Sequence, residues 1–515
     1  MRAGGSLTRR ALLGRAGAAL LGAGALTRAA AALASSRPPS LGDWARLRHA
    51  LKGPLVRPVD AGYDAARAVY DLRYASVAPA AIAYCASPHD VQVAVDFCRA
   101  HGVAPIPRCG GHSYGGYSTG TGLVIDVTRM SGVAVGRGVA TVGAGTRLID
   151  LYSGVGAAGV LVPGGSCPTV GISGLALGGG NGVLSRRYGL TCDAIESLTL
   201  VSADARVLAV DAGSHGDLYW ACRGGGGRNF GIVTSLRLRV EPIPPIALFT
   251  LEFPWAAAGD LLVAWMDWIG RAPDELWSNC LLLSGGPGGL AARATGVYCG
   301  SAAALSGHVQ TLVRAVGAAP TVSFVGPETY LRAMFVEAGC ADLTLAQCHI
   351  SSPGSAGTLA RSAFAAKSAY LTAPPPSHGI GAFTDAVESF LRELPALGGA
   401  LAFDSFGGAI NAVAAGATAF VHRDALAQLQ IDASWGSGAS PATVATVQAW
   451  LAQTARAVAP YTNGQAYQNY IDPTLADWKE AYYGSNLPRL QRVKRAYDPD
   501  DAFSFAQSIP PAPRG

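Results

Sequence analysis

The 515-residue sequence has little charge and none of the common metal-binding spacings. Charged residues make up 14% of the chain, whereas an ordinary soluble protein has about 25%. Neither Cys-x-x-Cys nor His-x-x-x-His occurs, which argues against a zinc site. We therefore expect a compact globular protein without a metal centre.

Long hydrophobic runs are also missing. The longest uncharged apolar stretch near the N-terminus covers residues 16–27, whereas a membrane-spanning helix needs about 20 such residues. It follows the paired Arg9 and Arg10 and precedes the small residues 30–34. This pattern predicts a twin-arginine signal peptide over residues 1–34 and export to the periplasm or the exterior, with no stable membrane insertion. The alternative is a disordered basic tail.

The excess of basic residues lies in that leader. Residues 1–34 hold five of the 39 basic residues and no acidic one, so the rest of the chain balances its 34 acidic residues. A near-neutral protein without a basic patch is not expected to bind nucleic acid.

Composition divides the remaining chain into three parts, as expected for a length that exceeds one hydrophobic core. Residues 35–243 are rich in glycine and strand-like runs, and a Pro-rich linker follows at 241–245. Residues 244–464 contain longer amphipathic patterns, which predict helices near 258–271, 302–316, 381–394 and 442–458. Residues 465–515 return to dense polar and aromatic sequence.

Ten cysteines are present, and export would permit disulfides. Spacing suggests two pairs. Cys280 and Cys299 flank a Gly-rich turn, and Cys340 and Cys348 can close a small loop.

The loop 108–118 reads Arg-Cys-Gly-Gly-His-Ser-Tyr-Gly-Gly-Tyr-Ser between two strand-like runs. An ordinary buried turn needs one or two glycines, and this loop has four. Bare backbone of this kind lets a large polar ligand approach the N–H groups closely. We interpret the loop as a cradle for a phosphorylated cofactor.

A second glycine pattern, Gly154-x-Gly156-x-x-Gly159, matches the dinucleotide-binding consensus. That consensus must follow a strand and open a helix. Here the pattern follows a helix-like run at 148–152 and precedes a strand-like run at 160–163. We therefore interpret it as a helix C-terminus rather than a nicotinamide site.

Further glycine-rich and aromatic motifs follow in order: Cys167-Pro168-Thr169-Val170-Gly171, Gly178-Gly179-Gly180, Tyr188-Gly189-Leu190, Arg223-Gly224-Gly225-Gly226 with Asn229-Phe230-Gly231, Tyr467-x-Asn469-Tyr470, and Gln507-Ser508-Ile509-Pro510. Together with Gly110-Gly111-His112-Ser113-Tyr114 they resemble the berberine bridge enzyme-like FAD-linked oxidases of the vanillyl-alcohol oxidase superfamily. The resemblance runs from about residue 76 to 510 and implies an α+β fold. A two-lobed, p-cresol methylhydroxylase-type FAD-binding domain (35–243) would be completed by residues 465–515, with a substrate domain of antiparallel sheet and helices (244–464) inserted.

The resemblance implies a bicovalent FAD. The residue matching His112 bonds the flavin 8α-methyl carbon, and the residue matching Cys167 bonds ring carbon C6. Taken alone, His112 reads as an ordinary loop histidine, and Cys167 as a buried thiol or half of a disulfide. The cofactor-binding residues implied are His112, Cys167, Arg108, Cys109, Gly110, Gly111, Ser113, Tyr114, Tyr117, Ser118, Pro168, Thr169, Val170, Gly171, Gly174, Gly178, Gly179, Gly182, Gly231, Ile232, Val233 and Asn469.

The same resemblance implies a base that removes a substrate proton while hydride passes to the flavin. Tyr470 matches the family's usual base, with Tyr467 and Gln430 as catalytic neighbours; the alternative is two core tyrosines. A phenol needs a neighbouring cation or hydrogen bonds to ionise near neutral pH. The family's lysine position is Gln428 here, so the activating cation is missing there.

Val170 matches the residue that accompanies oxygen reactivity in relatives. The leading hypothesis is therefore an oxidase acting on a hydroxyl-bearing substrate, either a carbohydrate or a secondary metabolite, with molecular oxygen reduced to peroxide. The alternatives are a dehydrogenase with another acceptor and a flavin-binding protein with little catalysis. The missing lysine and Cys109, which replaces the usual Gly or Ser, support the last. Leu175 also follows Gly174 where histidine is common.

Overall fold

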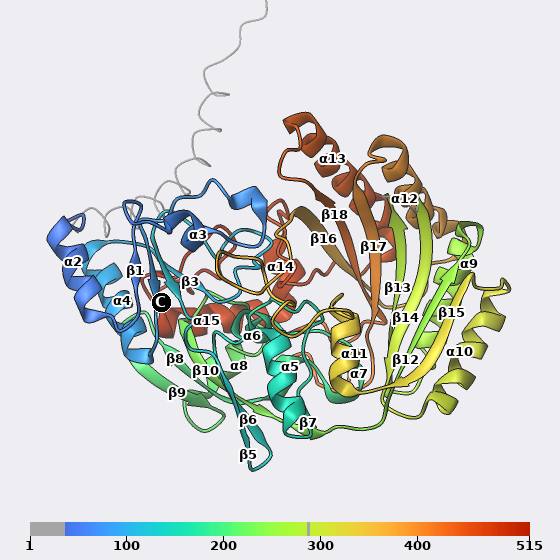
Figure 1. Cartoon of the computed structure of the whole chain (residues 1–515), viewed down its shortest axis with the longest axis horizontal. Helices are drawn as coiled ribbons and strands as arrows, with labels where there is room; N and C mark the ends of the chain where they lie inside the picture. The colour runs from blue at the N-terminus through green and yellow to red at the C-terminus, as the bar shows by residue number, and fades with distance from the viewer. Residues whose placement is uncertain (1–36, 286–288, 515) are drawn as a thin grey trace, which may run out of the picture.

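The computed structural model describes residues 37–285 and 289–514. The predicted signal peptide therefore lies outside the described residues. Figure 1 shows two halves side by side, one built from the beginning and end of the chain and the other from its middle.

The first half opens with a small sheet in the order β1-β2-β4-β3, in which the last three strands run parallel. Helix α4 (Pro88–His101) packs against this sheet and begins at Ser87, whose hydroxyl accepts the Asp90 N–H. Pro88 fits the first turn and Gly102, at φ 64°, ends the helix. The strands are β1 (Leu55–Val56), β2 (Ala81–Tyr84), β4 (Leu123–Asp126) and β3 (Pro105–Arg108).

A five-stranded antiparallel sheet completes this half: β5 (Val133–Gly136), β6 (Val139–Gly143), β10 (Ile232–Arg239), β8 (Ile195–Val201) and β9 (Val207–Asp211). Helix α5 (Leu148–Ala157) ends just before β7 (Val160–Leu161), and Gly159 between them has a φ of 74°. The glycine pattern 154–159 is thus a helix C-terminus, as predicted.

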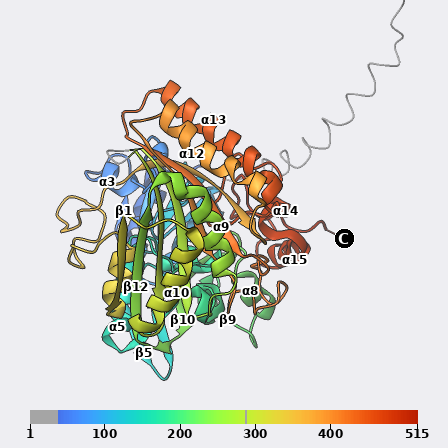
Figure 2. The same ribbon diagram turned by 90° about the vertical axis from the view of Figure 1, so that its right-hand side faces the viewer.

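The middle of the chain forms a seven-stranded antiparallel sheet. Its strand order is β15 (Val322–Glu328), β12 (Ile246–Phe253), β14 (Leu290–Tyr298), β13 (Leu276–Ser284), β17 (Gly398–Ser405), β18 (Ala427–Trp435) and β16 (Ala363–Leu371). Helices α9 (Ala258–Ile269), α10 (Ala302–Val316), α12 (Gly381–Glu393) and α13 (Pro441–Val458) cover its outer face (Figures 1 and 2). These helices confirm the four predicted from periodicity, and the α+β class is confirmed.

Alternation along β18 assigns its side chains to two faces. Leu429, Ile431 and Ala433 join the buried core under the helices. Because side chains alternate along a strand, Gln428, Gln430 and Asp432 point to the opposite face, toward the first half.

The C-terminal segment returns to the first half. Helix α15 (Leu487–Tyr497) packs against α8 (Gly216–Ala221). Lys494 is fully buried, and its ammonium donates to Asn229 O at 2.9 Å and to Asp498 at 2.7 Å. This buried cation ties the tail to the loop that precedes β10.

Of the two proposed disulfides, Cys340–Cys348 is present and Cys280–Cys299 is wrong. In the hairpin of β13 and β14, Cys280 lies opposite Ala294, whereas the Cys299 N–H bonds to Glu275 O. Five residues along a strand separate the two sulfurs' positions by about 17 Å, so both thiols stay free and buried.

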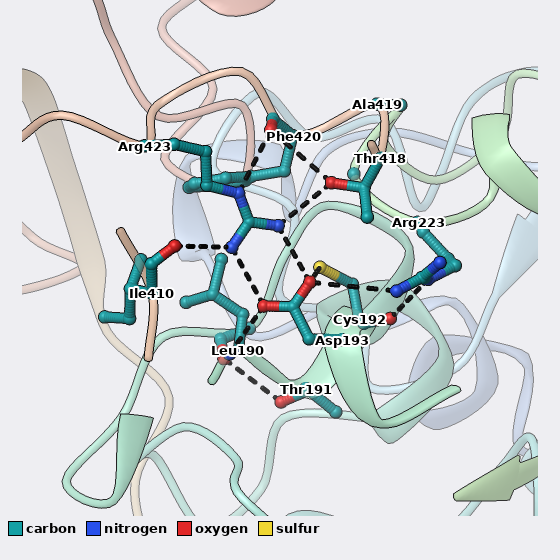
Figure 3. Close-up of polar contacts among 12 residues, drawn as sticks. Leu190, Thr191, Cys192, Asp193, Arg223, Ile410, Thr418, Ala419, Phe420 and Arg423 are labelled. Atoms are coloured by element: carbon teal, nitrogen blue, oxygen red, sulfur yellow. Dashed lines mark hydrogen bonds and ion pairs between the residues drawn. The ribbon is translucent and has the colours of Figure 1, made fainter. Parts of the chain in front are cut away.

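A buried ion pair joins the two halves (Figure 3). Arg423, in the connection between β17 and β18, donates to both carboxylate oxygens of Asp193, at 2.8 and 2.9 Å. The two side chains are 3% and 7% exposed. Arg423 also donates to Ile410 O, Thr418 and Phe420 O, so every guanidinium nitrogen has a partner.

Candidate active site

A cavity of about 350 Å³ lies where the two halves meet. Its wall combines the loop after β3, the segments around 165–175 and 227–233, the tail residues 467–471, and side chains from the middle sheet. Most of the predicted site residues line it: Arg108, Cys109, Gly110, Gly111, His112, Ser113, Tyr114, Tyr117, Ser118, Cys167, Val170, Gly171, Gly174, Gly182, Gly231, Ile232, Val233, Tyr467, Asn469 and Tyr470.

The other predicted residues, Pro168, Thr169, Gly178, Gly179 and Gln430, do not line the wall of this cavity. Three of them contact wall residues directly. Thr169 hydrogen-bonds His112, Gly178 packs on Asn469, and Gln430 donates to the Tyr114 hydroxyl at 3.2 Å. Their contribution is therefore to hold wall residues in place.

Two glycines are required by close backbone contacts. A Cβ on Gly110 would lie 2.4 Å from the Gly171 nitrogen, and one on Gly178 would lie 2.0 Å from Asn469 Oδ1. Any side chain at either position would push apart segments that must pack tightly. The glycine-rich loops thus bring distant parts of the chain together as well as leaving room in the cavity.

His112 is held as a neutral imidazole. Its Nε2 lies 2.9 Å from Thr169 Oγ1, and its ring stacks on Tyr70 at a centroid distance of 4.1 Å. Burial, assisted by the positive charges of Arg147 and Arg361, lowers the pKa of His112 to about 3. A neutral ring nitrogen keeps the lone pair that a nucleophile needs.

Cys167 is exposed to solvent, and it lines the cavity. Surrounding atoms desolvate its thiolate and raise the pKa of its thiol, while the N–H groups of Thr169 and Val170 act in the opposite direction. By contrast, the Cys109 thiol donates to Ala144 O at 3.0 Å, and burial raises its pKa. Of the two thiols, Cys167 is the accessible one, and Cys109 is held protonated.

The Tyr467 hydroxyl is occupied by hydrogen bonds within the protein. Its oxygen accepts hydrogen bonds from Gly180 N at 2.8 Å, Asn469 Nδ2 at 2.9 Å and Asn181 N at 3.4 Å. Burial raises the pKa of Tyr467 to about 12, against the opposing effect of these donors. The side chain therefore anchors the loop 180–181 to the tail.

Tyr470 lies in a stack of aromatic rings. Its ring is 5.1 Å from that of Tyr114 with an interplanar angle of 7°, and 5.0 Å from that of Tyr467. Among the described residues its hydroxyl has no hydrogen-bond partner. Burial first, and then the charges of Tyr114 and Asp404, raise the pKa of Tyr470 well above its usual value. A lone Tyr470 would be a poor base near neutral pH.

The middle sheet supplies carboxylates that sequence reasoning missed. Asn279, Asp404 and Gln428 lie directly opposite one another on β13, β17 and β18, so they form one row across the sheet. Asp404 lines the cavity, as does Glu337 at the end of α11 (Tyr330–Glu337). Burial raises the pKa of each carboxyl to about 7, and for Glu337 the charge of Asp404 adds to the effect.

This row also contains the position that lacks the activating lysine. Gln428 is buried, accepts from Asn181 at 3.2 Å, and has an amide nitrogen without a partner among the described residues. The position where relatives carry a lysine thus lies beside the Asp404 carboxylate. A carboxyl whose pKa burial raises to about 7 therefore lies beside the position from which the lysine is missing.

The residues present fit FAD. Arg228 lines the cavity, and burial lowers its pKa to about 10. It is held in the left-handed region at φ 62° and donates to Tyr117 O at 2.9 Å, and its buried Nε has no partner in the part of the chain that the structure describes. A buried cation beside bare glycine backbone suits a pyrophosphate. Sequence reasoning named neither Arg228 nor Phe505, whose ring it faces at 5.6 Å.

The comparisons with known proteins agree with this fit. A family model described as "FAD binding domain" matches residues 79–211, and one described as "Berberine and berberine like" matches residues 466–510. The FAD-linked oxidoreductase YgaK of Bacillus subtilis is 30% identical over 476 residues, covering 90% of this chain and 98% of the relative. The glucooligosaccharide oxidase of Sarocladium strictum is 30% identical, covering 87% and 91%.

Among solved structures, Physcomitrella patens BBE-like 1 matches with a TM-score of 0.82 and 32% identity, covering 91% of this chain and 99% of that one. The match therefore includes both halves and the cavity between them.

Proposed function

Because the chain belongs to the berberine bridge enzyme-like family of FAD-linked oxidoreductases, we propose that it oxidises a hydroxyl-bearing carbon of a carbohydrate and passes the electrons to molecular oxygen. The observation that carries this proposal is the pair Asn279 and Asp404 from the polar row of the middle sheet, which lines the same cavity as Tyr470, His112 and Cys167.

Bound FAD would supply the two-electron acceptor. His112 and Cys167 would hold it covalently, since the first is a neutral imidazole and the second is the accessible thiol of the cavity. Arg228 and the glycine backbone at 110–111 would hold its phosphates. Acid denaturation of the purified protein tests the attachment. A precipitate that retains the yellow colour supports it, and colour in the supernatant contradicts it.

The single variants His112→Ala and Cys167→Ala separate the two attachments. Each should retain the flavin through the remaining bond, whereas the double variant should release it in acid. If either single variant alone releases all of its flavin, only one bond was present.

The substrate proton would leave through Tyr470 and Asp404. Tyr470 faces the cavity without a competing hydrogen bond, and the nearby Asp404 carboxyl, whose pKa is about 7, is ionised in much of the protein at neutral pH. A carboxylate of this pKa is well matched to accept a proton near pH 7. Asp404 would itself accept the proton, since its charge raises the pKa of Tyr470, whereas a cation would lower it.

Carbohydrate is favoured as the substrate class because the cavity offers polar groups on its middle-sheet side. Asn279, Asp404 and Glu337 line it beside the Trp277 indole, whose N–H is buried and has no partner among the described residues. The similarity to a glucooligosaccharide oxidase supports this choice. Peroxide release on a panel of mono- and oligosaccharides tests it.

Val170 on the cavity wall favours oxygen as the acceptor, and a dehydrogenase remains the second candidate. Sugar-dependent reduction of an artificial acceptor without peroxide would favour the dehydrogenase. Absence of turnover with any acceptor, in protein that carries flavin, would favour a flavin-binding protein with little catalysis.

We also propose export through the leader 1–34. The Cys340–Cys348 disulfide supports it, because structural disulfides persist mainly outside the cytosol. Replacing Arg9 and Arg10 by lysine should leave the protein in the cytoplasm in a fractionation experiment, whereas unchanged export would contradict the twin-arginine route.

A further inference from the structure

A second cavity, of about 710 Å³, lies on the other side of the loop that carries His112. The two cavities share Arg108, Cys109, Gly110 and Gly111 as part of their walls. The segment 346–357, which contains Cys348 of the Cys340–Cys348 disulfide, lines its opposite side. Nothing in the proposed reaction uses this space.

Three arginines line the second cavity: Arg108, Arg147 and Arg361. Arg108 is 5% exposed, and its Nε pairs with Asp126 at 2.6 Å while Nη2 donates to Ala66 O at 2.7 Å. Its Nη1 is buried and has no partner among the described residues. One guanidinium nitrogen of Arg108 is therefore free for a ligand.

Arg147 and Arg361 carry charge that the protein does not neutralise. Among the described residues, the buried Arg147 Nη1 has no partner, and Arg361 donates only to Ser351 O, at 3.2 Å. Within residues 37–285 and 289–514, neither forms an ion pair with a carboxylate. The other charged groups on the wall are committed: Asp126 to Arg108, and His349 to Asp150 at 3.1 Å.

Bringing these guanidinium groups together is costly. Burial and the charges of Arg108 and Arg147 lower the pKa of Arg361. A buried donor without a partner has lost its hydrogen bonds to water, and this loss is larger when the donor is charged. The arrangement is unfavourable unless something negative and rich in acceptors occupies the space.

We infer that the second cavity binds a small oxoanion, a phosphate or a carboxylate, between Arg147 and Arg361, with Arg108 Nη1 as a third donor. Phosphate and carboxylate both present a pair of oxygens that the planar guanidinium fork recognises. The bound anion would connect the start of α5, the loop of His112 and the approach to β16. It would therefore stabilise the folded protein. This site is independent of the proposed oxidation.

Thermal unfolding of the flavin-loaded protein tests the inference. Sodium phosphate and sodium succinate are titrated separately, with sodium chloride keeping the ionic strength constant. We expect the Tm to rise saturably with at least one of the two anions, since a ligand that binds only the folded state stabilises it. The anion with the lower half-saturation concentration identifies the class of ligand.

Variants connect the effect to the cavity. Arg147→Gln and Arg361→Gln should each raise the half-saturation concentration of the anion by roughly tenfold or more. This is the loss of affinity expected for one charge-assisted hydrogen bond. Arg314→Gln is the matched control, because Arg314 is exposed on α10 and donates only to Thr311. Arg361→Lys keeps the charge and loses the fork. Its half-saturation concentration should lie between those of Arg361→Gln and the unsubstituted protein.

Two results would overturn the inference. One is a Tm that does not respond saturably to either anion in the unsubstituted protein. The other is a response that stays unchanged in Arg147→Gln and Arg361→Gln. Calorimetric titration with inorganic phosphate at a temperature well below Tm gives the same answer without relying on unfolding, so a variant of low stability still reports.

Discussion

Asp404 is the residue on which the proposed proton transfer depends most. We expect Asp404→Asn to lower kcat/KM by about 10²–10⁴, the usual contribution of a general base. In the unsubstituted enzyme, kcat/KM should rise with pH through an apparent pKa near 7, because the carboxylate form is the active one. Since Glu337 titrates in the same range beside it, that apparent pKa belongs to the pair.

Asp432→Asn is the matched control for this prediction. Asp432 is on the neighbouring strand, burial also raises its pKa to about 7, and it does not line the cavity. Its replacement should leave the acid limb of the pH profile in place. An Asp404→Asn enzyme with an unchanged profile would show that another group accepts the proton.

Asp404 should also reduce the stability of the folded protein at alkaline pH. The folded-state pKa of Asp404 is about 7, above the ordinary value of 3.8. Between roughly pH 4 and pH 7 the unfolded chain releases this proton and the folded protein retains it. Folding stability therefore falls as pH rises through this window. Asp404→Asn should melt a few degrees above the unsubstituted protein at pH 8, and close to it at pH 4. An equal difference at both pH values would contradict this.

Single residues also show which parts of the site could not be predicted from the sequence. The motifs around His112 and Cys167 are contiguous in the chain, so the family resemblance that they carry predicted that both line one cavity. Asp404 is a lone acidic residue in a strand, and only the register of β13, β17 and β18 brings it beside Gln428. Arg228 was missed for a related reason, because its importance comes from burial next to Tyr117 and Phe505.

At the level of elements, the glycine segments should tolerate substitution very unequally. Gly178→Ala places a methyl group into the Asn469 amide. Overpacking of this kind typically costs about 1–3 kcal/mol, and the shift of Asn469 should also lower activity by moving Tyr467. Gly307, inside α10, has nothing within 4 Å of an added Cβ. Gly307→Ala should therefore stabilise the protein by up to about 1 kcal/mol. Denaturant unfolding measures the stability of both variants, and peroxide release measures their activity. Similar behaviour of the two variants would contradict the close contact assigned to Gly178.

Local patterns predicted the elements well and their pairing poorly. The helices of the middle part follow from the periodicity of their apolar residues. The Cys280–Cys299 pairing failed because cysteine spacing says nothing about hairpin register. Cys340–Cys348 succeeded because eight residues of loop can close on themselves without any such register.

At the scale of the whole molecule, Asp193 and Arg423 decide how firmly the two halves are joined (Figure 3). We expect Asp193→Ala to lower the free energy of unfolding by about 3–5 kcal/mol, because it leaves a buried guanidinium without its counter-charge. The exposed pair of Arg489 and Asp217 is the control. Asp217→Ala should cost no more than about 1 kcal/mol. Equal losses in the two variants would mean that the buried pair has no special role.

The pair also reaches the active site, which gives a second measurement. Phe420 accepts from Arg423, and its ring lies 6.0 Å from Tyr467 and against the position of Gly179. Loosening this connection should let Tyr467 move, and with it the loop 180–181 that its hydroxyl binds. Arg423→Lys keeps a charge but loses the planar fork that bonds the two Asp193 oxygens through separate nitrogens. We therefore expect it to lower kcat measurably at temperatures well below its Tm. If the variant is less stable but fully active, the ion pair only holds the two halves together and does not position Tyr467.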